Sequence, residues 1–397
     1  MSMTENIDRD FIIESASRLL SIKAISPLSG GDGEYKKAIE LKKILEELGY
    51  KQFIEYNTQD DAGNIRPNIV LKVGNLDKTL WIIDHLDTVP EGDIKLWSHE
   101  PFQATLEGDK IYGRGSEDNG QAIFTSLLLL KNLEKSNLKV NLGLAFVADE
   151  ETGNTYGIKY LIKKNVFKPE DLIIVPDAGT NEGFVIETAE KTVMQLKFEV
   201  LGSQGHASMP QNAVNALRES CKFMDIMDST LHKKYNRKNP LFIPPYSTFE
   251  PTEHEKNIDN VNTIPGRDVL YWDFRVLPEY SSDDVLKDID SMISTYSRDS
   301  GAKISYTIRD IVNAPEPTPD SAEVIMKLKK AIKTVIGADA ITIGIGGETF
   351  ASFLRSKGYD VAVWSTTAIE NAHMPDEYCL IPHIFQDVEV YKQLLYN

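Results

Sequence analysis

The chain has 397 residues, more than one hydrophobic core usually serves, and its 60 acidic and 43 basic residues give a formal net charge of -17 at pH 7. A charge of this sign opposes sequence-independent binding to nucleic acid or to an anionic membrane, because both need clustered Lys and Arg. Two cysteines exclude a disulfide framework, and the acidic amino terminus lacks the apolar core of a signal peptide, so we expect a cytoplasmic protein of two domains.

The first half of the chain alternates helical and strand patterns. Apolar spacing predicts helices over 8–22, 34–48, 121–133 and 155–164, and strands over 52–56, 68–73, 80–84, 141–148 and 171–175. The apolar run 122–130 is too short to span a bilayer, and we expect a buried helix there. Because several strands end in polar residues, we expect an open α/β sheet whose carboxyl edge collects them.

The pattern changes near Lys191. Apolar and polar residues alternate over 194–200, 270–276 and 304–308, which indicates strands with one wet face. With helical patterns over 212–231 and 283–297 and a weak strand at 246–250, the order becomes the β-α-β-β-α-β of a ferredoxin-like unit. After the proline-rich linker 313–319, helices at 322–336 and 349–357 and a strand at 361–364 resume the α/β pattern. We predict one domain formed by residues 1–190 and 314–397, with a second, 191–313, inserted into it.

The stretch Leu80–Pro90, LWIIDHLDTVP, carries an apolar strand straight into a histidine and two acids. Asp84, His85 and Asp87 are costly to bury unpaired, so we expect them to emerge at the carboxyl edge of the sheet. If the strand geometry continues, Asp87 holds one ring nitrogen of His85 while the other faces a metal ion. The alternative is a surface histidine beside a turn.

Further polar side chains follow other strands and turns. They are Asp118 in a glycine-rich turn before a helix, Glu150 and Glu151 after a strand, Asp177 after another strand, and His373 late in the chain. Two histidines and three carboxylates suit a pair of metal ions that share a bridging carboxylate, lower the pKa of bound water and polarise a carbonyl. Of the adjacent Glu150 and Glu151, one would be a ligand and the other would take the proton.

Each of these residues also has an ordinary structural explanation. Asp118 fits a helix cap, Glu150 and Glu151 fit a solvated loop, Asp177 fits a turn after proline, and His373 fits the surface. Spacing by itself leaves these alternatives open.

A series of short motifs gives a more specific indication. In chain order, they are HLDTVP, GRGSEDNGQ, DEETG, PDAG, GSQGHAS, NTIPGR, DFR, GIGGETF and NAHMPDE. Together they resemble the M20 family of two-zinc amide hydrolases, which includes succinyl-diaminopimelate desuccinylase, acetylornithine deacetylase and carboxypeptidase G2-like enzymes. The resemblance implies an α/β, two-domain fold: a mixed-sheet zinc-hydrolase catalytic domain with an inserted ferredoxin-like α+β domain that acts as lid and dimerisation domain.

The resemblance also implies a metal site and a mechanism. The implied ligands are His85 and Asp177 for one zinc ion, Glu151 and His373 for the other, and Asp118 as the bridge, with Co²⁺ or Mn²⁺ as alternative metals. Glu150 would be the general base, and Asp87 would orient His85. A zinc-activated water would attack an amide carbonyl, and Glu150 would pass the proton of that water to the leaving amine. A cis peptide bond is implied after Asp118.

Other residues match positions that contact the substrate in the family. His206 corresponds to a histidine that reaches the active site of the partner chain in a homodimer and steadies the oxyanion, and the alternative is a core histidine. The matched substrate positions are Asn262, Arg275, Gly347, Glu348 and Thr349. Arg275 suits a substrate carboxylate or a structural salt bridge. The histidines that match no motif are expected at the surface: His99, His232, His254 and His383.

Two positions depart from the family pattern. Where many members carry Met-Lys-Gly after the bridging aspartate, this chain has Asn119-Gly120-Gln121, so a cation beside the bridge is absent. Glu348 adds a negative charge to a turn that often carries small or hydroxyl residues.

We therefore expect a hydrolase of an N-acylated amino acid, of the desuccinylase or deacetylase type. A dipeptidase or carboxypeptidase that cleaves a short peptide on the same site is the first alternative. The second is a metal-free binding protein that kept the fold.

Overall fold

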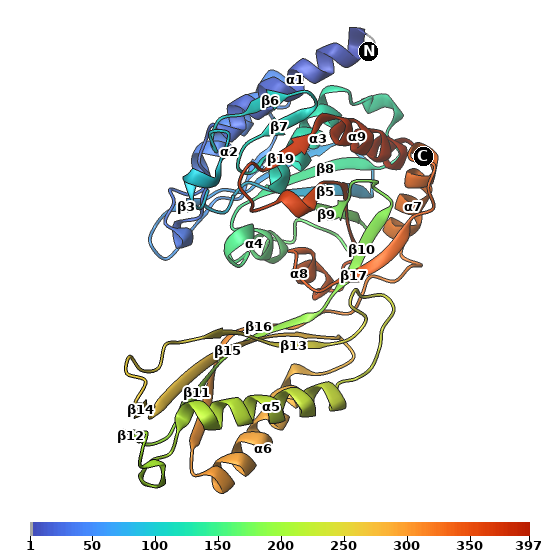
Figure 1. Ribbon diagram of the computed structural model, residues 1–397. Coiled ribbons are helices and arrows are strands. Elements are labelled where there is room, and N and C mark those ends of the chain that lie inside the picture. Colours follow the sequence, from blue (N-terminus) through green and yellow to red (C-terminus); the bar gives the residue numbers. More distant parts are fainter. Residues whose placement is uncertain (1–2) are drawn as a thin grey trace. The chain divides into compact units, whose positions relative to one another are not determined.

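A computed structural model describes residues 3–397 (Figure 1). The chain divides into two compact units. The first comprises the residues up to Thr188 together with Pro317–Thr342 and Thr349–Asn397, and the second comprises Ala189–Glu316 and Ile343–Glu348. The second unit thus interrupts the first in the sequence.

The first unit contains most of an eight-stranded mixed sheet. In spatial order its strands are β1 (Ile54–Glu55), β4 (Ile69–Val73), β8 (Asn141–Val147), β5 (Thr79–His85), β9 (Leu172–Thr180), β18 (Val361–Thr366), β10 (Val185–Glu190) and β17 (Ile341–Ile345). The central strands β8, β5, β9 and β18 are parallel, whereas β4 and β10 pair antiparallel with their neighbours. Parallel strands end at the same edge, so the residues that follow β8 and β5 meet those of β9 there.

Helices cover both faces of this sheet (Figure 1). One layer consists of α1 (Met3–Leu20), α2 (Tyr35–Glu47), α3 (Gln121–Lys131), α7 (Glu323–Val335) and α9 (Ile381–Tyr396). The other consists of α4 (Ile158–Lys163) and α8 (Ala351–Arg355). Leu80 and Ile82 of β5 pack in the core of the first layer, and Trp81 and Ile83 pack in that of the second. The two-residue period of a strand explains this alternation, and a continuous apolar run suits a strand covered on both faces.

A small three-stranded sheet brings two distant segments of the site together. It consists of β6 (Thr105–Glu107), β7 (Lys110–Tyr112) and β19 (Tyr378–Leu380). Because Tyr378 pairs with Tyr112, the loop that carries His373 lies beside the segment that leads to Asp118. A further pair, β2 (Thr58–Gln59) and β3 (Ile65–Arg66), forms a separate small hairpin.

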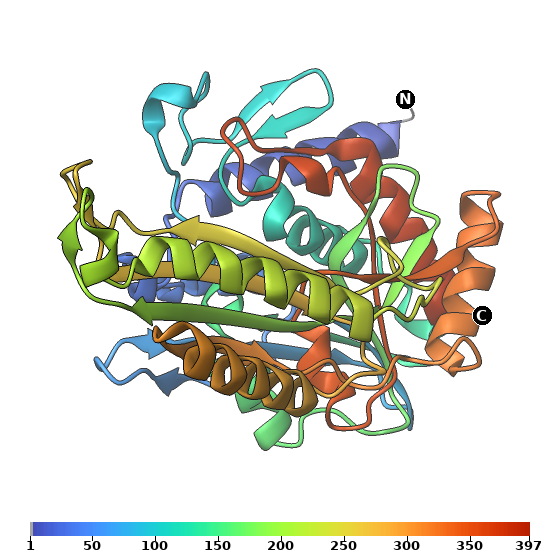
Figure 2. The same cartoon turned by 60° about the horizontal axis from the view of Figure 1, so that its bottom comes forward.

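The second unit contains a four-stranded antiparallel sheet. Its spatial order is β13 (Thr248–His254), β15 (Arg267–Val276), β11 (Thr192–Leu201) and β16 (Lys303–Val312). The helices α5 (Ala216–Lys234) and α6 (Ser282–Ser300) lie side by side and share one core with this sheet (Figure 2). The chain order β-α-β-β-α-β and this strand order are those of a ferredoxin-like unit. The short strands β12 (Gly205–His206) and β14 (Thr263–Ile264) pair with each other.

The predicted helices and strands are observed as helices and strands, but some of them begin or end at other residues. The helix expected from residue 212 begins at Ala216, because Asn215 caps it by accepting the N–H of Arg218 at 3.1 Å. The strand expected to end at residue 175 continues to Thr180, because it keeps pairing with β18.

Several observed elements lie outside the predicted ones: β6, β7, β10, β17, β19 and α9. The acidic residues of β10 are typical of a solvent-exposed segment. Glu187 is nevertheless buried, and it forms an ion pair with Arg355 at 3.0 Å. Pairing of this kind depends on residues that are distant in sequence, so local periodicity does not reveal it.

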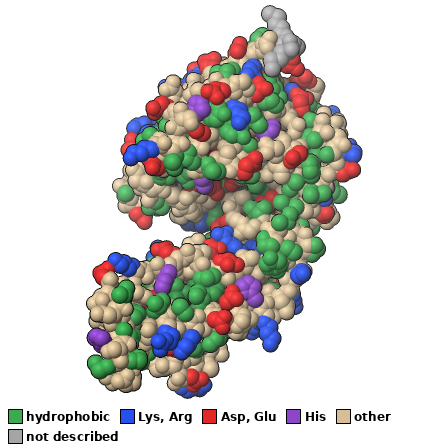
Figure 3. All heavy atoms as spheres, in the orientation of Figure 1, with side chains coloured by type: hydrophobic (Ala, Val, Ile, Leu, Met, Phe, Trp, Pro, Cys, Tyr) green, Lys and Arg blue, Asp and Glu red, His purple; other side chains and the backbone are tan. Residues whose placement is uncertain are grey.

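The part of the chain that the structure describes contains no helix with both the length and the apolar character needed to cross a membrane. On the face drawn in Figure 3, Lys and Arg side chains lie scattered among acidic ones.

Candidate active site

Three neighbouring parallel strands bring candidate residues to one edge of the sheet. His85 is the last residue of β5, Asp177 lies in β9, and Glu150 and Glu151 follow β8. Between β8 and these glutamates, Asp149 turns the chain with a positive φ of 66°. The expected meeting of strand ends is therefore observed.

Asp118 lies between two histidines from distant parts of the chain. Its Oδ1 is 2.8 Å from Nε2 of His85, and its Oδ2 is 3.0 Å from Nε2 of His373. Asp177 Oδ1 is 3.5 Å from the same nitrogen of His85, and Glu151 Oε1 is 3.3 Å from that of His373. These atoms form two groups that share Asp118, and within each group they lie within 4.8 Å of one another. The peptide bond after Asp118 is cis, as expected.

Burial and mutual repulsion change the acidity of these carboxylates. Burial and the charge of Asp177 raise the pKa of Glu150 well above its usual range. Burial and the charge of Asp118 raise the pKa of Glu151 to about 7. Burial also opposes the ionisation of Asp118, but hydrogen bonds with the two histidines hold its pKa well below its usual range. So much negative charge away from water is costly unless a cation neutralises it.

The donor set fits a pair of divalent metal ions. Each group combines an imidazole nitrogen with carboxylate oxygens, which suits zinc. The Nδ1 atom of His85 is 3.1 Å from the carbonyl oxygen of Asp87, which can only accept, so Nδ1 carries the proton of the neutral ring. In the neutral ring the lone pair of Nε2 faces carboxylate oxygens, and a metal ion bound between them would take the place of the second proton that an imidazolium ring carries there. The residues therefore fit two ions that share Asp118.

The carboxylate of Asp87 lies near the ring of His85 and also holds two backbone groups. Its Oδ1 is 3.6 Å from Nδ1 of His85, too far for a hydrogen bond, and the ring is oriented by the backbone carbonyl of Asp87. The carboxylate instead accepts the backbone N–H groups of Glu150 and Glu151, each at 3.0 Å. The predicted role of Asp87 in orienting His85 is thus performed by its carbonyl, because β5 ends at His85 and the alternation of side chains does not continue to Asp87.

The prediction that the side chain of Asp84 emerges at the sheet edge is wrong. This residue is fully buried and does not emerge at the sheet edge. The hydroxyl of Ser126 in α3 donates a hydrogen bond to its carboxylate at 2.8 Å, and burial raises its pKa to about 7. A helix packed on this face supplies a partner that the strand pattern does not show.

Two buried residues that the strand pattern does not single out support Asp118 and His373. Glu377 Oε1 accepts the N–H groups of Glu117 and Asp118, each at 3.0 Å. Arg114 forms an ion pair with Glu377 and donates to the carbonyl oxygen of His373 at 3.2 Å. Arg114 lies in the motif GRGSEDNGQ and Glu377 lies in the motif NAHMPDE. These motifs are the sequence signal that could identify them.

A second buried ion cluster supports the turn that carries Glu150. Arg66 donates through Nε to Glu34 at 3.0 Å, and its Nη2 lies 3.3 Å from Asp149. Glu34 also accepts the N–H of Asp149 at 3.2 Å. All three side chains are fully buried. Local sequence gives no signal for this cluster, because its members come from separate loops and a two-residue strand.

His206 is exposed in the short strand β12 of the second unit, which excludes the core alternative. Its Nδ1 accepts the backbone N–H of Ser208 at 3.1 Å. The proton of the neutral ring is therefore on Nε2, where it can be donated outward. The carbonyl oxygen of Asn262 accepts the N–H of Ala207 at 2.9 Å, so Asn262 lies beside His206.

The guanidinium of Arg275 is engaged by groups of its own unit. Its Nε and Nη2 bind the two carboxylate oxygens of Asp273 at 2.6 and 3.0 Å, and its Nη1 donates to the carbonyl oxygen of Gly346 at 2.8 Å. Of the two predicted roles, the structure shows the salt bridge.

The other three predicted substrate contacts follow one another in the chain. Gly347 is half-buried and Glu348 is exposed in the second unit. Thr349 is buried at the start of α8, where its hydroxyl accepts the N–H of Ala351 at 3.3 Å. That position favours a structural role for Thr349.

His99 is more buried than the surface position that the sequence predicts. Its ring stacks on Tyr112 with centroids 4.1 Å apart, and its Nδ1 is 3.2 Å from Asp376, so the side chain is 16% exposed. It therefore packs against the loop that follows His373. Of the other histidines that match no motif, His383 is half-buried, and His232 and His254 are exposed.

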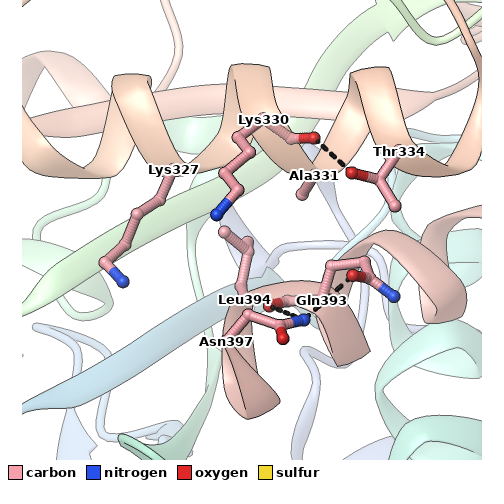
Figure 4. A pocket seen from close by; sticks show the side chains of 7 residues that line it. All are labelled: Lys327, Lys330, Ala331, Thr334, Gln393, Leu394 and Asn397. Atoms are coloured by element: carbon pink, nitrogen blue, oxygen red, sulfur yellow. Dashed lines mark hydrogen bonds between the residues drawn. The ribbon is translucent and has the colours of Figure 1, made fainter.

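A cavity of about 180 Å³ between α7 and α9 is separate from the predicted site. Its lining residues are Lys327, Lys330, Ala331, Thr334, Gln393, Leu394 and Asn397 (Figure 4). None of them belongs to the two groups around Asp118.

Residues 81–397 match peptidase family M20/M25/M40, and this range includes every residue of the two groups around Asp118. The chain belongs to this family. An uncharacterized metallohydrolase of Methanococcus maripaludis is 43% identical to this M20 chain, over 97% of the chain and 99% of that protein. A succinyl-diaminopimelate desuccinylase of Wolbachia pipientis is 26% identical, over 97% of the chain and 92% of that protein.

A solved structure shows the same fold. It is an M20 family metallo-carboxypeptidase from Sulfolobus solfataricus, with a TM-score of 0.72 at 21% identity, covering 100% of this chain and 99% of that one. The predicted M20 membership is confirmed, and the chain is an M20 metallohydrolase with an α/β mixed-sheet fold. This favours an enzyme over a metal-free binding protein.

Proposed function

We propose that this M20 metallohydrolase cleaves the amide bond of an N-acylated amino acid and uses two zinc ions, with Co²⁺ or Mn²⁺ as alternatives. The observation that carries the proposal is the pair of histidine and carboxylate groups that share Asp118. The desuccinylase relative, which matches nearly the whole chain, supports the desuccinylase or deacetylase type.

The residues divide the work according to their positions. When bound, two such ions lower the pKa of a water molecule and polarise a carbonyl oxygen. Asp118 would hold both sides of the site together, because its two oxygens face different histidines. Glu150 would take a proton from the attacking water and give it to the leaving amine. Its backbone is tied to Asp87, which keeps the base in place during this transfer.

We also propose that the inserted unit acts as a lid and as the dimerisation domain. His206 would reach the active site of a second chain and donate its Nε2 proton to the developing oxyanion. The exposure of His206 and the hydrogen bond from Ser208 to Nδ1 support this role. An oxyanion donor of this kind contributes roughly 10²–10³ in rate.

A substrate panel tests the proposal. The purified chain, stripped with a chelator and reloaded with Zn²⁺, should hydrolyse N-succinyl or N-acetyl amino acids, and the stripped chain should not. Hydrolysis of dipeptides alone would replace the proposal with a dipeptidase or carboxypeptidase. Metal analysis under saturating Zn²⁺ should find two ions per chain, and fewer than one would contradict the metal site.

A further inference from the structure

Strands β5 and β9 stop pairing before they reach the site. Their register ends at Ile82 and Ile174, although β5 continues to His85 and β9 continues through Pro176. Parallel strands satisfy each other's N–H and C=O groups along a ladder. Beyond the last pair, the backbone groups of His85 and Pro176 that face the gap need other partners, since buried backbone polar groups are rarely left unpaired.

The side chain of Asn119 supplies both partners. Its Oδ1 accepts the backbone N–H of His85 at 3.3 Å, and its Nδ2 donates to the carbonyl oxygen of Pro176 at 2.8 Å. A backbone N–H can only donate and a carbonyl can only accept, so these contacts fix the orientation of the amide. A primary amide has the donor and acceptor of a peptide group. Asn119 thus takes the place of a missing ladder position between the two strands.

The Asn119 bridge contacts one of the two groups of candidate metal ligands. Asn119 joins the strands that carry His85 and Asp177, and its Nδ2 also lies 3.4 Å from Asp177 Oδ1. No hydrogen bond of its side chain to Glu151 or His373 is found among residues 3–397. The residue is 2% exposed, so water does not compete freely for its contacts.

We propose that Asn119 is a positioning residue that sets the separation of His85 and Asp177 and thereby tunes the metal affinity of that group alone. The inference rests on the proposed function, because it assumes that the two groups bind metal. Loss of the amide leaves the N–H of His85 and the C=O of Pro176 unpaired and frees the two strand ends to move apart. Partners that orient metal ligands typically contribute 10–100-fold to metal affinity.

Variants that isolate each group provide the test. His373→Ala keeps the group of His85 and Asp177, and His85→Ala keeps the group of Glu151 and His373. Asn119→Leu, which has nearly the same size but no polar atoms, is added to each background. Zn²⁺ binding is then measured against a competing chromophoric chelator.

In the His373→Ala background, Asn119→Leu should weaken Zn²⁺ binding by roughly 10–100-fold. In the His85→Ala background, it should leave the affinity unchanged. Equal affinity with and without Asn119→Leu in the first background would overturn the inference, and so would an equal loss in both. If the unaltered chain binds no Zn²⁺, the proposed function itself fails, which is a separate result.

Asn141 offers a matched control at the other end of the sheet. It is also fully buried, and it bonds to the backbone of Leu76, donating to the carbonyl oxygen at 2.7 Å and accepting the N–H at 2.8 Å. Asn141→Leu should lower the unfolding temperature but leave Zn²⁺ affinity unchanged in both backgrounds. If Asn119→Leu does not fold, as judged by circular dichroism, Asn119→Ser decides the question. Its shorter hydroxyl leaves room for water, and it should show a smaller loss in the same background only.

Discussion

The carboxylate of Asp87 holds the backbone of Glu150, with Oδ1 accepting its N–H at 3.0 Å. The other oxygen accepts the N–H of Glu151 at the same distance. Because Asp87 is fully buried, these two bonds are shielded from water and fix the direction in which the adjacent glutamates leave the strand edge. One carboxylate therefore positions both the proposed base and a proposed metal ligand.

Asp87→Asn tests this arrangement. The amide keeps one acceptor oxygen and adds an N–H donor, so one of the two backbone N–H groups loses its partner. We expect kcat to fall by roughly 10–100-fold, the range for groups that orient metal ligands, and Asp87→Ala to cause a larger loss. Steady-state kinetics with N-acyl substrates measures the effect, and Asp93→Asn at an exposed position is the control. An unchanged kcat would show that the turn does not depend on Asp87.

Glu150→Gln separates proton transfer from metal binding. The amide cannot take a proton, but the variant keeps the shape of the side chain. Turnover should fall by roughly 10²–10⁴ while the zinc content stays at the unaltered value. Metal analysis and kinetics on one preparation provide both readouts, with the exposed Glu170→Gln as control. A full rate would remove Glu150 from the role of base.

Mixed dimers test the role of His206 across chains. His206→Ala should slow turnover without loss of zinc, because this residue lies in the other compact unit from the candidate metal ligands. Mixing inactive Glu150→Gln chains with His206→Ala chains should restore part of the activity, since a mixed dimer contains one site with both residues intact. Native mass spectrometry identifies the mixed dimer. If that dimer forms and stays inactive, His206 does not act on the partner's site.

Arg114→Met should destabilise the first unit. The change leaves Glu377 buried without its ion-pair partner, and breaking a buried pair costs about 3–5 kcal/mol. Denaturant unfolding measures the loss in the free energy of unfolding. Arg267→Met, which removes an exposed ion pair with Glu199 in the second unit, should lose far less. Equal losses in the two variants would argue against a special contribution of the buried pair.

Asp387 should make stability depend on pH. It is fully buried in α9, both of its oxygens accept the N–H of Thr366, and burial raises its pKa from 3.8 to about 8. A pKa that is higher in the folded chain means that the folded chain binds the proton more tightly. The contribution of Asp387 to the free energy of unfolding is therefore fully present below about pH 4, and it is lost as the pH rises to about 8.

Asp387→Asn should remove this dependence, because the amide does not titrate and still accepts the N–H of Thr366. Between about pH 4 and 8 the free energy of unfolding should fall less steeply with pH in the variant than in the unaltered chain. The difference in slope should be up to about 1.4 kcal/mol per pH unit. Denaturant unfolding of both proteins under identical metal conditions measures it, and parallel pH profiles would refute the assignment.

The sequence by itself determined the family, the α/β class and the residues around Asp118. The last residues of parallel apolar strands meet at one edge of the sheet, and the motifs identify which of the polar residues there belong together. For this reason His85, Asp177, Glu151 and His373 could be named before their positions were known.

Only the tertiary structure decided which groups hold these residues in place. The bond from Asp87 to Glu150, the Asn119 bridge between β5 and β9, and the pair of Arg114 with Glu377 join segments that are distant in sequence. Periodicity shows which face a side chain points to, but not which neighbour lies opposite, because that depends on how strands are ordered and where their pairing stops.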